Sequence, residues 1–330
     1  MTPQNLILPT DRAKIEKLRL VKQVFYHASC PDGTAAAIII KSAFRGIGEP
    51  KFHSLQYDTD FMDKIEPREG QLFVDITPPK TRWEEWKPFE PIVLDHHETV
   101  EHVVRGLGGT YETNERHSGA MLAYEEILLP LSKAGIGSFS STELEEFRSF
   151  AECAMIRDTW KKDHELWRKA CAQGLAVQFH GSRPLIEKMN REPFDFDGIY
   201  ELGEMLQVNS DRRTELTANG ASHDTVSDGE KTYKVAFFNS TEKVISDAAN
   251  YLVDRGVDIA IGYFYLFEDG QQKMSVSIRT NGSVSASSIA KTFGGGGHHR
   301  AAGFRISNAN SAPPGVLLSY VEQGVLSARQ

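Results

Sequence analysis

The sequence predicts an α/β protein, with an N-terminal domain built on a parallel sheet and a smaller C-terminal α/β domain. Short apolar runs alternate with helix-like segments from residue 24 to about 100, which is typical of βαβ units. The length of 330 residues exceeds that of a usual single core. A polar, turn-rich stretch from about 182 to 230 separates two patterned regions. We therefore expect domains at 1–185 and 231–330, a linker at 186–230, and a cleft between the domains.

The expected elements follow from the apolar runs. VFYH (24–27), QLFVDIT (71–77) and PIVLDHH (91–97) are predicted strands, and TAAAIIIKSAF (34–44) is a predicted helix. Residues 118–175 look helical throughout. In the C-terminal domain we expect strands at 233–239, 259–267 and 273–280, a helix at 240–256, and a glycine-rich turn at 293–304.

Composition narrows the class of protein. The chain is 40% hydrophobic and 25% charged, has no apolar run long enough to span a membrane, and starts without a secretory signal pattern, so we expect a cytoplasmic protein. Its three cysteines, Cys30, Cys153 and Cys171, have no paired spacing, which argues against disulfides. A net charge of −8 disfavours binding to long nucleic acid but allows a short phosphorylated substrate.

Candidate metal ligands stand at the ends of the three predicted N-terminal strands. Carboxyl ends of parallel strands are where ligands gather, and carboxylate and imidazole donors suit Mn²⁺. A lone Asp is more often a turn former or helix cap, and Asp32 in PDG has that alternative. The joint pattern nevertheless favours two divalent cations that activate a water for phosphate-ester hydrolysis. The candidates are His27, Asp32, Asp75, Asp95, His96, His97 and Asp158.

The glycine-rich segment predicts an anion-binding loop. Four consecutive glycines (294–297) can present bare N–H groups to a phosphate, and a flexible linker is the alternative. Arg279 would point from a sheet edge and clamp the phosphate, unless it is only a surface arginine. Ser118 and Gly119 open a helix whose N-terminus favours an anion, although N-capping explains Ser118 equally well. The predicted phosphate contacts are Arg279, Gly295, Gly296, Gly297, His298, His299 and Arg300.

Six motifs resemble those of one known superfamily. LDHH (94–97) resembles the signature of the DHH phosphoesterases, and FGGGGHHRAAG (293–303) resembles the hallmark of their DHHA1 substrate domain. The other four, in the superfamily's order, are YHASCPDG (26–33), FVDITPP (73–79), HSGAMLAYE (117–125) and IRDTW (156–160). The resemblance spans nearly the whole chain and implies a role for each candidate.

By this resemblance, His27 and Asp75 would hold a first metal, and Asp75 would bridge to a second. The second metal would be completed by Asp32, His96 and Asp158. Asp95 would orient a neighbouring histidine, and His97 would lie near the scissile phosphate. Two Mn²⁺ ions are expected, with Mg²⁺, Co²⁺ or Zn²⁺ as alternatives.

The first motif departs from the family pattern, because Cys30 stands where an aspartate is usual. A thiolate could bind a borderline ion such as Zn²⁺, or Cys30 could be an inert small side chain. We favour a first site that is altered but functional.

The resemblance implies a phosphodiesterase of the nanoRNase, or 3′–5′ oligoribonuclease, branch, which releases mononucleotides from short oligonucleotides. The chain lacks room for the extra nucleic-acid-binding domains of larger RecJ-like exonucleases. Alternative enzymatic activities are a 3′-phosphoadenosine 5′-phosphate phosphatase or a cyclic-dinucleotide phosphodiesterase. A non-catalytic nucleotide-binding protein is the alternative if Cys30 disables the first metal site. We expect a short oligonucleotide or nucleotide as substrate, neither long duplex nor membrane as partner, and a homodimer as one arrangement that the sequence allows.

Overall fold

The computed structural model describes residues 9–28, 30–45, 47–56, 60–112, 117–240, 242–268, 270–307, 319 and 321–325. The chain divides into two compact units, Met1–Gln207 and Val208–Gln330. The boundary falls inside helix α10 (Phe196–Asn219), within the stretch that composition predicted to be a linker. Helix α10 is polar because half of its residues are exposed, yet it contains no proline and forms a regular helix of 24 residues.

Unit 1 contains the predicted parallel sheet, which is confirmed. Its five strands are β1 (Gln23–His27), β2 (Lys51–Leu55), β3 (Gln71–Val74), β4 (Ile92–Asp95) and β5 (Thr110–Tyr111), in the order β2-β1-β3-β4-β5. Every pairing is parallel. The sequence did not reveal β2, a largely polar edge strand, or β5, which has only two residues.

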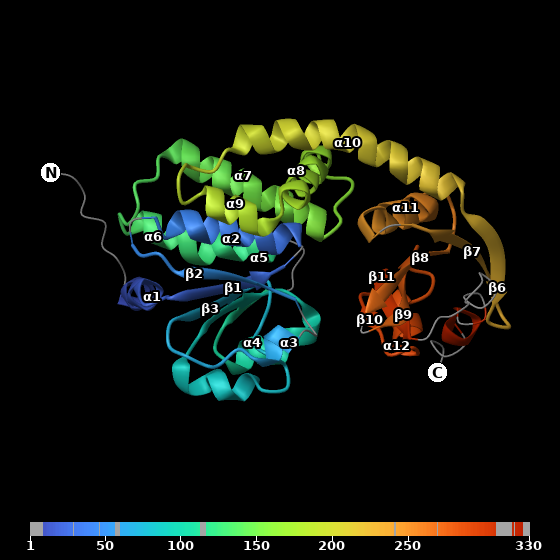
Figure 1. Ribbon diagram of the computed structural model, residues 1–330, viewed down its shortest axis with the longest axis horizontal. Helices are drawn as coiled ribbons and strands as arrows, with labels where there is room; N and C mark the ends of the chain where they lie inside the picture. Colours follow the sequence, from blue (N-terminus) through green and yellow to red (C-terminus); the bar gives the residue numbers. More distant parts are fainter. Residues whose placement is uncertain are drawn as a thin grey trace. The chain divides into compact units, whose positions relative to one another are not determined.

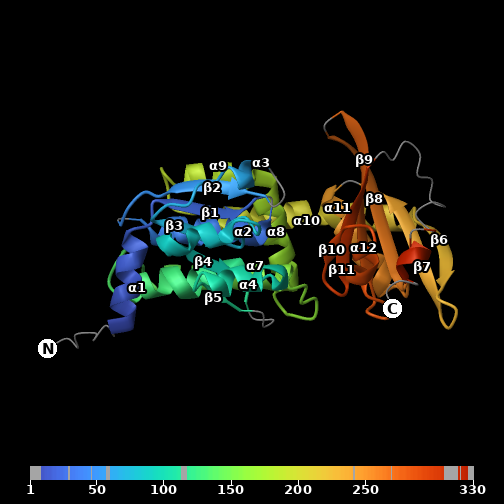
Figure 2. The ribbon, with the colours of Figure 1, turned by 90° about the horizontal axis from the view of Figure 1, so that it is seen from below.

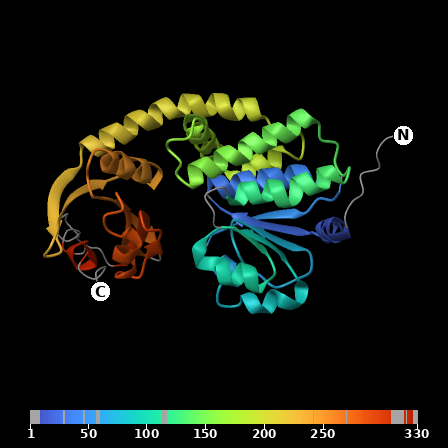
Figure 3. The same ribbon diagram turned by 180° about the vertical axis from the view of Figure 1, so that it is seen from behind.

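Helices cover both faces of this sheet (Figure 1). One face carries α2 (Pro31–Ala43), α5 (Gly119–Ala123), α7 (Ser141–Asp158), α8 (Trp167–His180) and α9 (Ser182–Lys188). The other carries α3 (Asp60–Asp63) and α4 (Glu101–Gly106) (Figures 1 and 3). The remaining helical segments of unit 1 are α1 (Pro9–Arg19), η1 (Trp83–Phe89), η2 (Glu98–Val100), η3 (Tyr124–Leu128) and α6 (Leu129–Lys133). The region 118–175 is thus mainly helical, with breaks at 134–140 and 159–166.

Because both faces of the sheet are buried, the sequences of its inner strands are continuous apolar runs. Successive side chains of β3 point to opposite faces, so Leu72 and Val74 join the core under α2, whereas Phe73 packs with Trp86 on the other side. Helix α2 lies between the sheet and the outer helices (Figure 1), and Ile38 to Ile40 are fully buried. Figure 2 views unit 1 from below and shows its strands in the order β2-β1-β3-β4-β5. The polar ends of the strands are therefore the places where charged side chains can gather.

Unit 2 is a six-stranded mixed sheet, in the order β10-β11-β9-β8-β7-β6. The strands are β6 (Ser222–Ser227), β7 (Thr232–Asn239), β8 (Ile259–Glu268), β9 (Gln271–Thr280), β10 (Gly296–Gly297) and β11 (Ala301–Ser307). Helices α11 (Glu242–Asp254) and α12 (Ala286–Lys291) accompany it. The predicted strands and helix between 233 and 280 are confirmed. Among the described helices of the whole chain, none is long and apolar enough to cross a membrane.

Candidate metal centre

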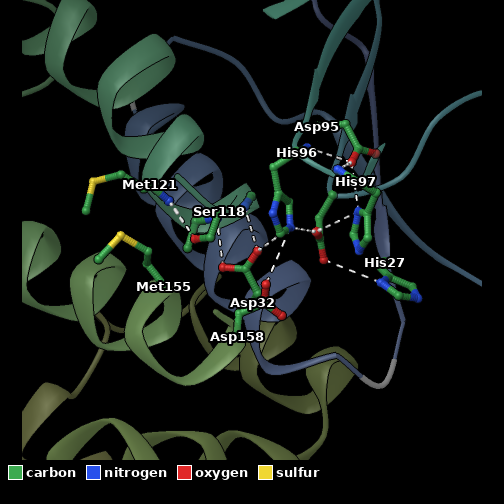
Figure 4. Close-up of polar contacts among 12 residues, drawn as sticks. His27, Asp32, Asp95, His96, His97, Ser118, Met121, Met155 and Asp158 are labelled. Atoms are coloured by element: carbon green, nitrogen blue, oxygen red, sulfur yellow. Dashed lines mark hydrogen bonds and ion pairs between the residues drawn. The ribbon is translucent and has the colours of Figure 1, made fainter. Parts of the chain in front are cut away.

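The carboxyl ends of three neighbouring strands meet in unit 1. His27 is the last residue of β1, Asp75 directly follows β3, and Asp95 ends β4. Because β1 pairs with β3 and β3 with β4, these three residues lie at one edge of the sheet. His96 and His97 follow Asp95, and Asp32 and Asp158 join them from two helices (Figure 4).

Asp75 occupies the middle of this cluster in a rare backbone conformation. Its φ is 58°, in the left-handed region, and its side chain is fully buried. Its backbone N–H donates to Leu94 O at 3.0 Å, which fixes the turn at the end of β3. Strain of this kind, at a non-glycine residue, concentrates at functional sites.

Three histidines surround the Asp75 carboxylate. His27 Nδ1 lies 3.4 Å from Oδ2, and His96 Nε2 lies 3.2 Å from Oδ1. His97 Nδ1 is 3.8 Å from the same Oδ1. Burial alone raises the pKa of Asp75, but the hydrogen bonds from His27 and His96 and the charge of His97 outweigh it and hold that pKa well below its ordinary range. Asp75 is therefore a carboxylate at neutral pH.

Asp32 and Asp158 add negative charge beside His96. His96 Nε2 lies 3.8 Å from Asp32 Oδ2 and 3.6 Å from Asp158 Oδ2. Burial and the charges of Asp75 and Asp158 raise the pKa of Asp32 to about 8. Burial lowers the pKa of His96, but its bond to Asp75 and the three carboxylates raise it to about 10. Without a cation, the cluster thus has to hold protons to limit repulsion among its carboxylates.

The backbone at the start of α5 binds a carboxyl group of the protein itself. Gly119 N donates to Asp32 Oδ2 at 2.6 Å, and Ala120 N donates to Asp32 Oδ1 at 3.1 Å. Ser118 is the N-cap, whose Oγ accepts from Met121 N at 3.4 Å. The N-capping alternative for Ser118 is therefore confirmed, and the N–H groups that were expected to favour an anion donate to Asp32.

Two glycines allow the backbone to approach the cluster. A Cβ on Gly33 would lie 2.6 Å from His27 O and 2.9 Å from Asp75 Oδ2. A Cβ on Gly119 would lie 2.6 Å from Asp75 Cβ and 3.0 Å from Asp32 Oδ2. Neither position tolerates a side chain without displacing Asp75. The sequence signal for this packing was the run of small residues after Asp32 and Ser118.

The described residues form three groups of possible metal ligands, whose donor atoms lie within 4.8 Å of one another in each group. Asp75 is shared by two groups, and His96 is also shared by two. This arrangement fits a pair of divalent cations with Asp75 between them, because each position offers carboxylate and imidazole donors. The groups are His27, Cys30 and Asp75; Asp75, His96 and His97; and Asp32, His96 and Asp158.

Asp95 holds His97 in place. Its Oδ1 accepts hydrogen bonds from His96 N at 2.7 Å and His97 N at 2.9 Å, and lies 2.8 Å from His97 Nδ1. Burial lowers the pKa of His97, whereas the bond to Asp95 and the charges of Asp75 and Asp95 raise it to about 9. With Nδ1 bound to Asp95, Nε2 is the ring nitrogen that can act on a ligand.

Cys30 stands at the N-cap position of α2, where its side chain makes no capping hydrogen bond. Its thiol is half-buried and belongs to the group with His27 and Asp75. Burial, followed by the charges of Asp75 and Asp158, raises its pKa well above the ordinary value. In the ion-free protein Cys30 is therefore a thiol.

Arg279 lies in unit 2, and its predicted place at a sheet edge is wrong. Strand β9 is interior, between β11 and β8. The guanidinium donates from Nη2 to Ser246 Oγ at 2.8 Å and from Nη1 to Ile278 O at 2.9 Å. An interior strand can carry this half-buried arginine because the serine of α11 takes part of its hydrogen-bonding capacity. No local sequence pattern marks Ser246 as the partner of Arg279.

The glycine-rich segment, which the sequence predicts as a turn, also contains a short strand that forms a tight hairpin. Gly296 and Gly297 pair with Gly303 and Ala302 of β11. A Cβ on Gly295 would lie 2.2 Å from Gly303 O, and Gly297 has φ 141°. Close strand pairing therefore requires these glycines independently of any ligand. The following residues, His298, His299 and Arg300, are exposed.

Comparison with known proteins identifies the domain in the C-terminal part of the chain. Residues 230–316 match the family model of the DHHA1 domain. This part of the chain is a DHHA1 domain, and the recognition of the DHH/DHHA1 superfamily from the sequence motifs is confirmed. A search of the curated proteins finds no match.

Solved structures resemble this chain at low sequence identity. RecJ from Thermus thermophilus, solved in complex with Mn²⁺, is 17% identical with a TM-score of 0.56, over 99% of this chain and 56% of the RecJ chain. An exopolyphosphatase-related protein from Bacteroides fragilis is 12% identical with a TM-score of 0.50, over 99% of this chain and all of that chain. A pGpG-specific phosphodiesterase, PggH from Vibrio cholerae, is 14% identical with a TM-score of 0.48, over 93% of this chain and all of that one. This chain thus spans about half the length of RecJ.

Proposed function

We propose that this protein is a metal-dependent phosphoesterase that hydrolyses the phosphodiester bonds of short oligonucleotides to mononucleotides. The observation that carries the proposal is the shared carboxylate of Asp75, which belongs to two adjoining groups of possible metal ligands. A pair of cations that share one carboxylate is the arrangement used for in-line displacement at phosphorus. The DHHA1 domain in unit 2 supports a phosphorylated substrate.

The proposed metals are two divalent cations, with Mn²⁺ preferred. RecJ, which shares the fold, was solved with Mn²⁺. His27 and Asp75 would hold the first ion, and Asp75, Asp32, His96 and Asp158 would hold the second. When bound, the cations would neutralise the phosphate and lower the pKa of the attacking water.

The protein's own residues would supply the proton and the orientation. Because Nδ1 of His97 is held by Asp95, Nε2 is the ring nitrogen that would donate a proton to the leaving oxygen. Asp95 positions that ring through the 2.8 Å contact with Nδ1. Asp32 and Asp75, kept in place by the backbone of α5 and the turn after β3, would need little movement to receive the ions.

The DHHA1 unit would bind the phosphate end of the substrate. Arg279 has a planar donor group already oriented by Ser246 and by the backbone of β9. The exposed β10–β11 turn would add backbone and side-chain donors. The proposed contacts are Arg279, Gly295, Gly296, Gly297, His298, His299 and Arg300.

The decisive experiment is Mn²⁺-dependent release of mononucleotides from RNA of about two to five nucleotides. We expect turnover by the native protein and none by Asp75→Ala, because the shared ligand would be lost. Near-native rates in Asp75→Ala would show that the bridging assignment is wrong. Parallel assays with 3′-phosphoadenosine 5′-phosphate and a cyclic dinucleotide distinguish the alternative enzymatic activities. Absence of turnover on all three substrates, in both native protein and Cys30→Asp, would favour the non-catalytic nucleotide-binding alternative.

A further inference from the structure

The two proposed cation positions have unlike donors. One group consists of His27, Cys30 and Asp75, and therefore includes a sulfur atom. Another consists of Asp32, His96 and Asp158, in which oxygen and nitrogen are the only donors. Asp75 adjoins both, since His96 Nε2 lies 3.2 Å from Asp75 Oδ1. The centre is thus asymmetric in ligand chemistry, although Asp75 of the first group contacts His96 of the second.

Cys30 differs from the buried cysteine of α7 in its surroundings. Cys153 is fully buried in an apolar cluster with Met155, Ile156 and Ala170, as expected of an inert small side chain. Cys30 instead lies among a histidine and carboxylates. An apolar packing role therefore does not explain Cys30.

The backbone around Cys30 is held against the site. Pro31 begins α2 directly after it, which restricts the start of the helix. Gly33 packs so closely on His27 and Asp75 that even a Cβ would overlap their atoms. The donor atoms of His27, Cys30 and Asp75 lie within 4.8 Å of one another, so small side-chain movements would bring them to bond lengths of about 2.0–2.3 Å.

Donor type decides which ion each position prefers. Thiolate and imidazole favour Zn²⁺, Co²⁺ and similar ions, whereas carboxylate-rich positions suit Mn²⁺ and Mg²⁺. A site with one sulfur, one nitrogen and one oxygen donor leaves the fourth position of a tetrahedral ion open for solvent or substrate, as in catalytic zinc sites. The Asp32–His96–Asp158 position has no comparable preference for a soft ion.

We propose that the centre binds two different metals: a thiophilic ion of the Zn²⁺ class at His27, Cys30 and Asp75, and a harder ion such as Mn²⁺ at Asp32, His96 and Asp158. This inference rests on the proposed function for its cations, but it is tested separately from turnover. The proposal also explains Cys30, which stands where the superfamily pattern has aspartate. The cysteine would change which metal the site prefers and would not abolish the site.

Cobalt is a spectroscopic probe for the sulfur ligand. We expect Co²⁺ added to the ion-free protein to give a near-ultraviolet thiolate-to-cobalt absorption band. Cys30→Ser should abolish the band, and Cys153→Ser and Cys171→Ser should retain it. A band that persists in Cys30→Ser, or native protein that binds Co²⁺ without a band, would overturn the proposal.

Metal analysis tests the mixed occupancy. Native protein equilibrated with one equivalent of Zn²⁺ and an excess of Mn²⁺ should retain about one of each per chain, and Cys30→Asp should bind the Zn²⁺ more weakly and shift towards two Mn²⁺. Two Mn²⁺ ions in the native protein would contradict the inference. A Co²⁺ band without turnover would leave the metal assignment standing and remove the proposed function, whereas turnover with Mn²⁺ and no band would do the reverse.

Discussion

The Asp32 carboxylate accepts a hydrogen bond of 2.6 Å from the backbone N–H of Gly119, a residue 87 positions further along the chain. Asp32 lies in the first turn of α2, and Gly119 begins α5. One proposed ligand therefore depends on a helix that supplies no ligand of its own. The same glycine packs against Asp75, so the start of α5 supports both carboxylates.

A methyl group at Gly119 should disrupt this support. We expect Gly119→Ala to weaken Mn²⁺ binding by about 10–100-fold, since its Cβ would lie 2.6 Å from Asp75 Cβ and displace that residue. Isothermal titration calorimetry measures the affinity. Gly48→Ala is the matched control, because a Cβ there meets nothing within 4 Å. Equal affinities for the two variants would refute this role.

Removal of divalent ions should lower thermal stability. Because cations would relieve repulsion among Asp32, Asp75 and Asp158, ligand binding should stabilise the folded state by about 2.7 kcal/mol at 100 times the dissociation constant. For a chain of 330 residues that corresponds to a rise in Tm of about 4 °C. Scanning calorimetry with EDTA or Mn²⁺ measures the shift. Asp75→Asn should show little response, and a native protein that behaves like it would argue against bound cations.

Asp95→Asn should impair catalysis more than metal binding. The carboxylate holds His97 through Nδ1 and stabilises its protonated form, whereas an amide does so poorly. We expect kcat to fall about 10–100-fold while Mn²⁺ content stays unchanged. Asp63→Asn, at an exposed position in α3, is the control. Loss of metal together with activity would assign Asp95 to the metal ligands instead.

Arg279→Ala should act mainly on substrate binding. Loss of a charged hydrogen-bond donor costs about 1.5–3 kcal/mol, which corresponds to a rise in KM of about 10–100-fold with kcat largely retained. Ser246→Ala should give a smaller rise in KM, since it removes only one anchor of the guanidinium. The comparison is Arg255→Ala, whose guanidinium stacks on Tyr251 in the same unit. Steady-state kinetics that show a fall in kcat alone would contradict a binding role.

Local pattern and motif order predicted much of the fold. The strands that end in His27 and Asp95 could be predicted because both faces of this sheet are buried, which produces uninterrupted apolar runs. Helix α10 was not predicted, because a helix with half of its residues exposed is polar enough to have the composition of a linker. The position of Arg279 on an interior strand depends on pairing with β11, which local sequence does not encode.

The sequence predicted which residues form the candidate site, but it did not predict how their side chains contact one another. The strand ends indicated which side chains would meet, since parallel strands share an edge. The contacts of Gly33 and Gly119 with Asp75 depend on how helices pack over that edge, and the hydrogen bond that Arg279 donates to Ser246 joins residues 33 positions apart. Such long-range contacts leave only weak traces in local composition.

The left-handed backbone conformation of Asp75 lets its effect on stability be measured apart from its proposed role as a metal ligand. Glycine adopts φ 58° without steric cost, whereas alanine does not. Both substitutions remove the carboxylate, so in denaturant titrations the free energy of unfolding of ion-free Asp75→Gly should exceed that of Asp75→Ala by about 1 kcal/mol. Selection for a stable chain alone would place glycine at this turn. The aspartate at this position therefore lowers the stability of the fold relative to glycine and supplies the carboxylate on which the proposed activity depends.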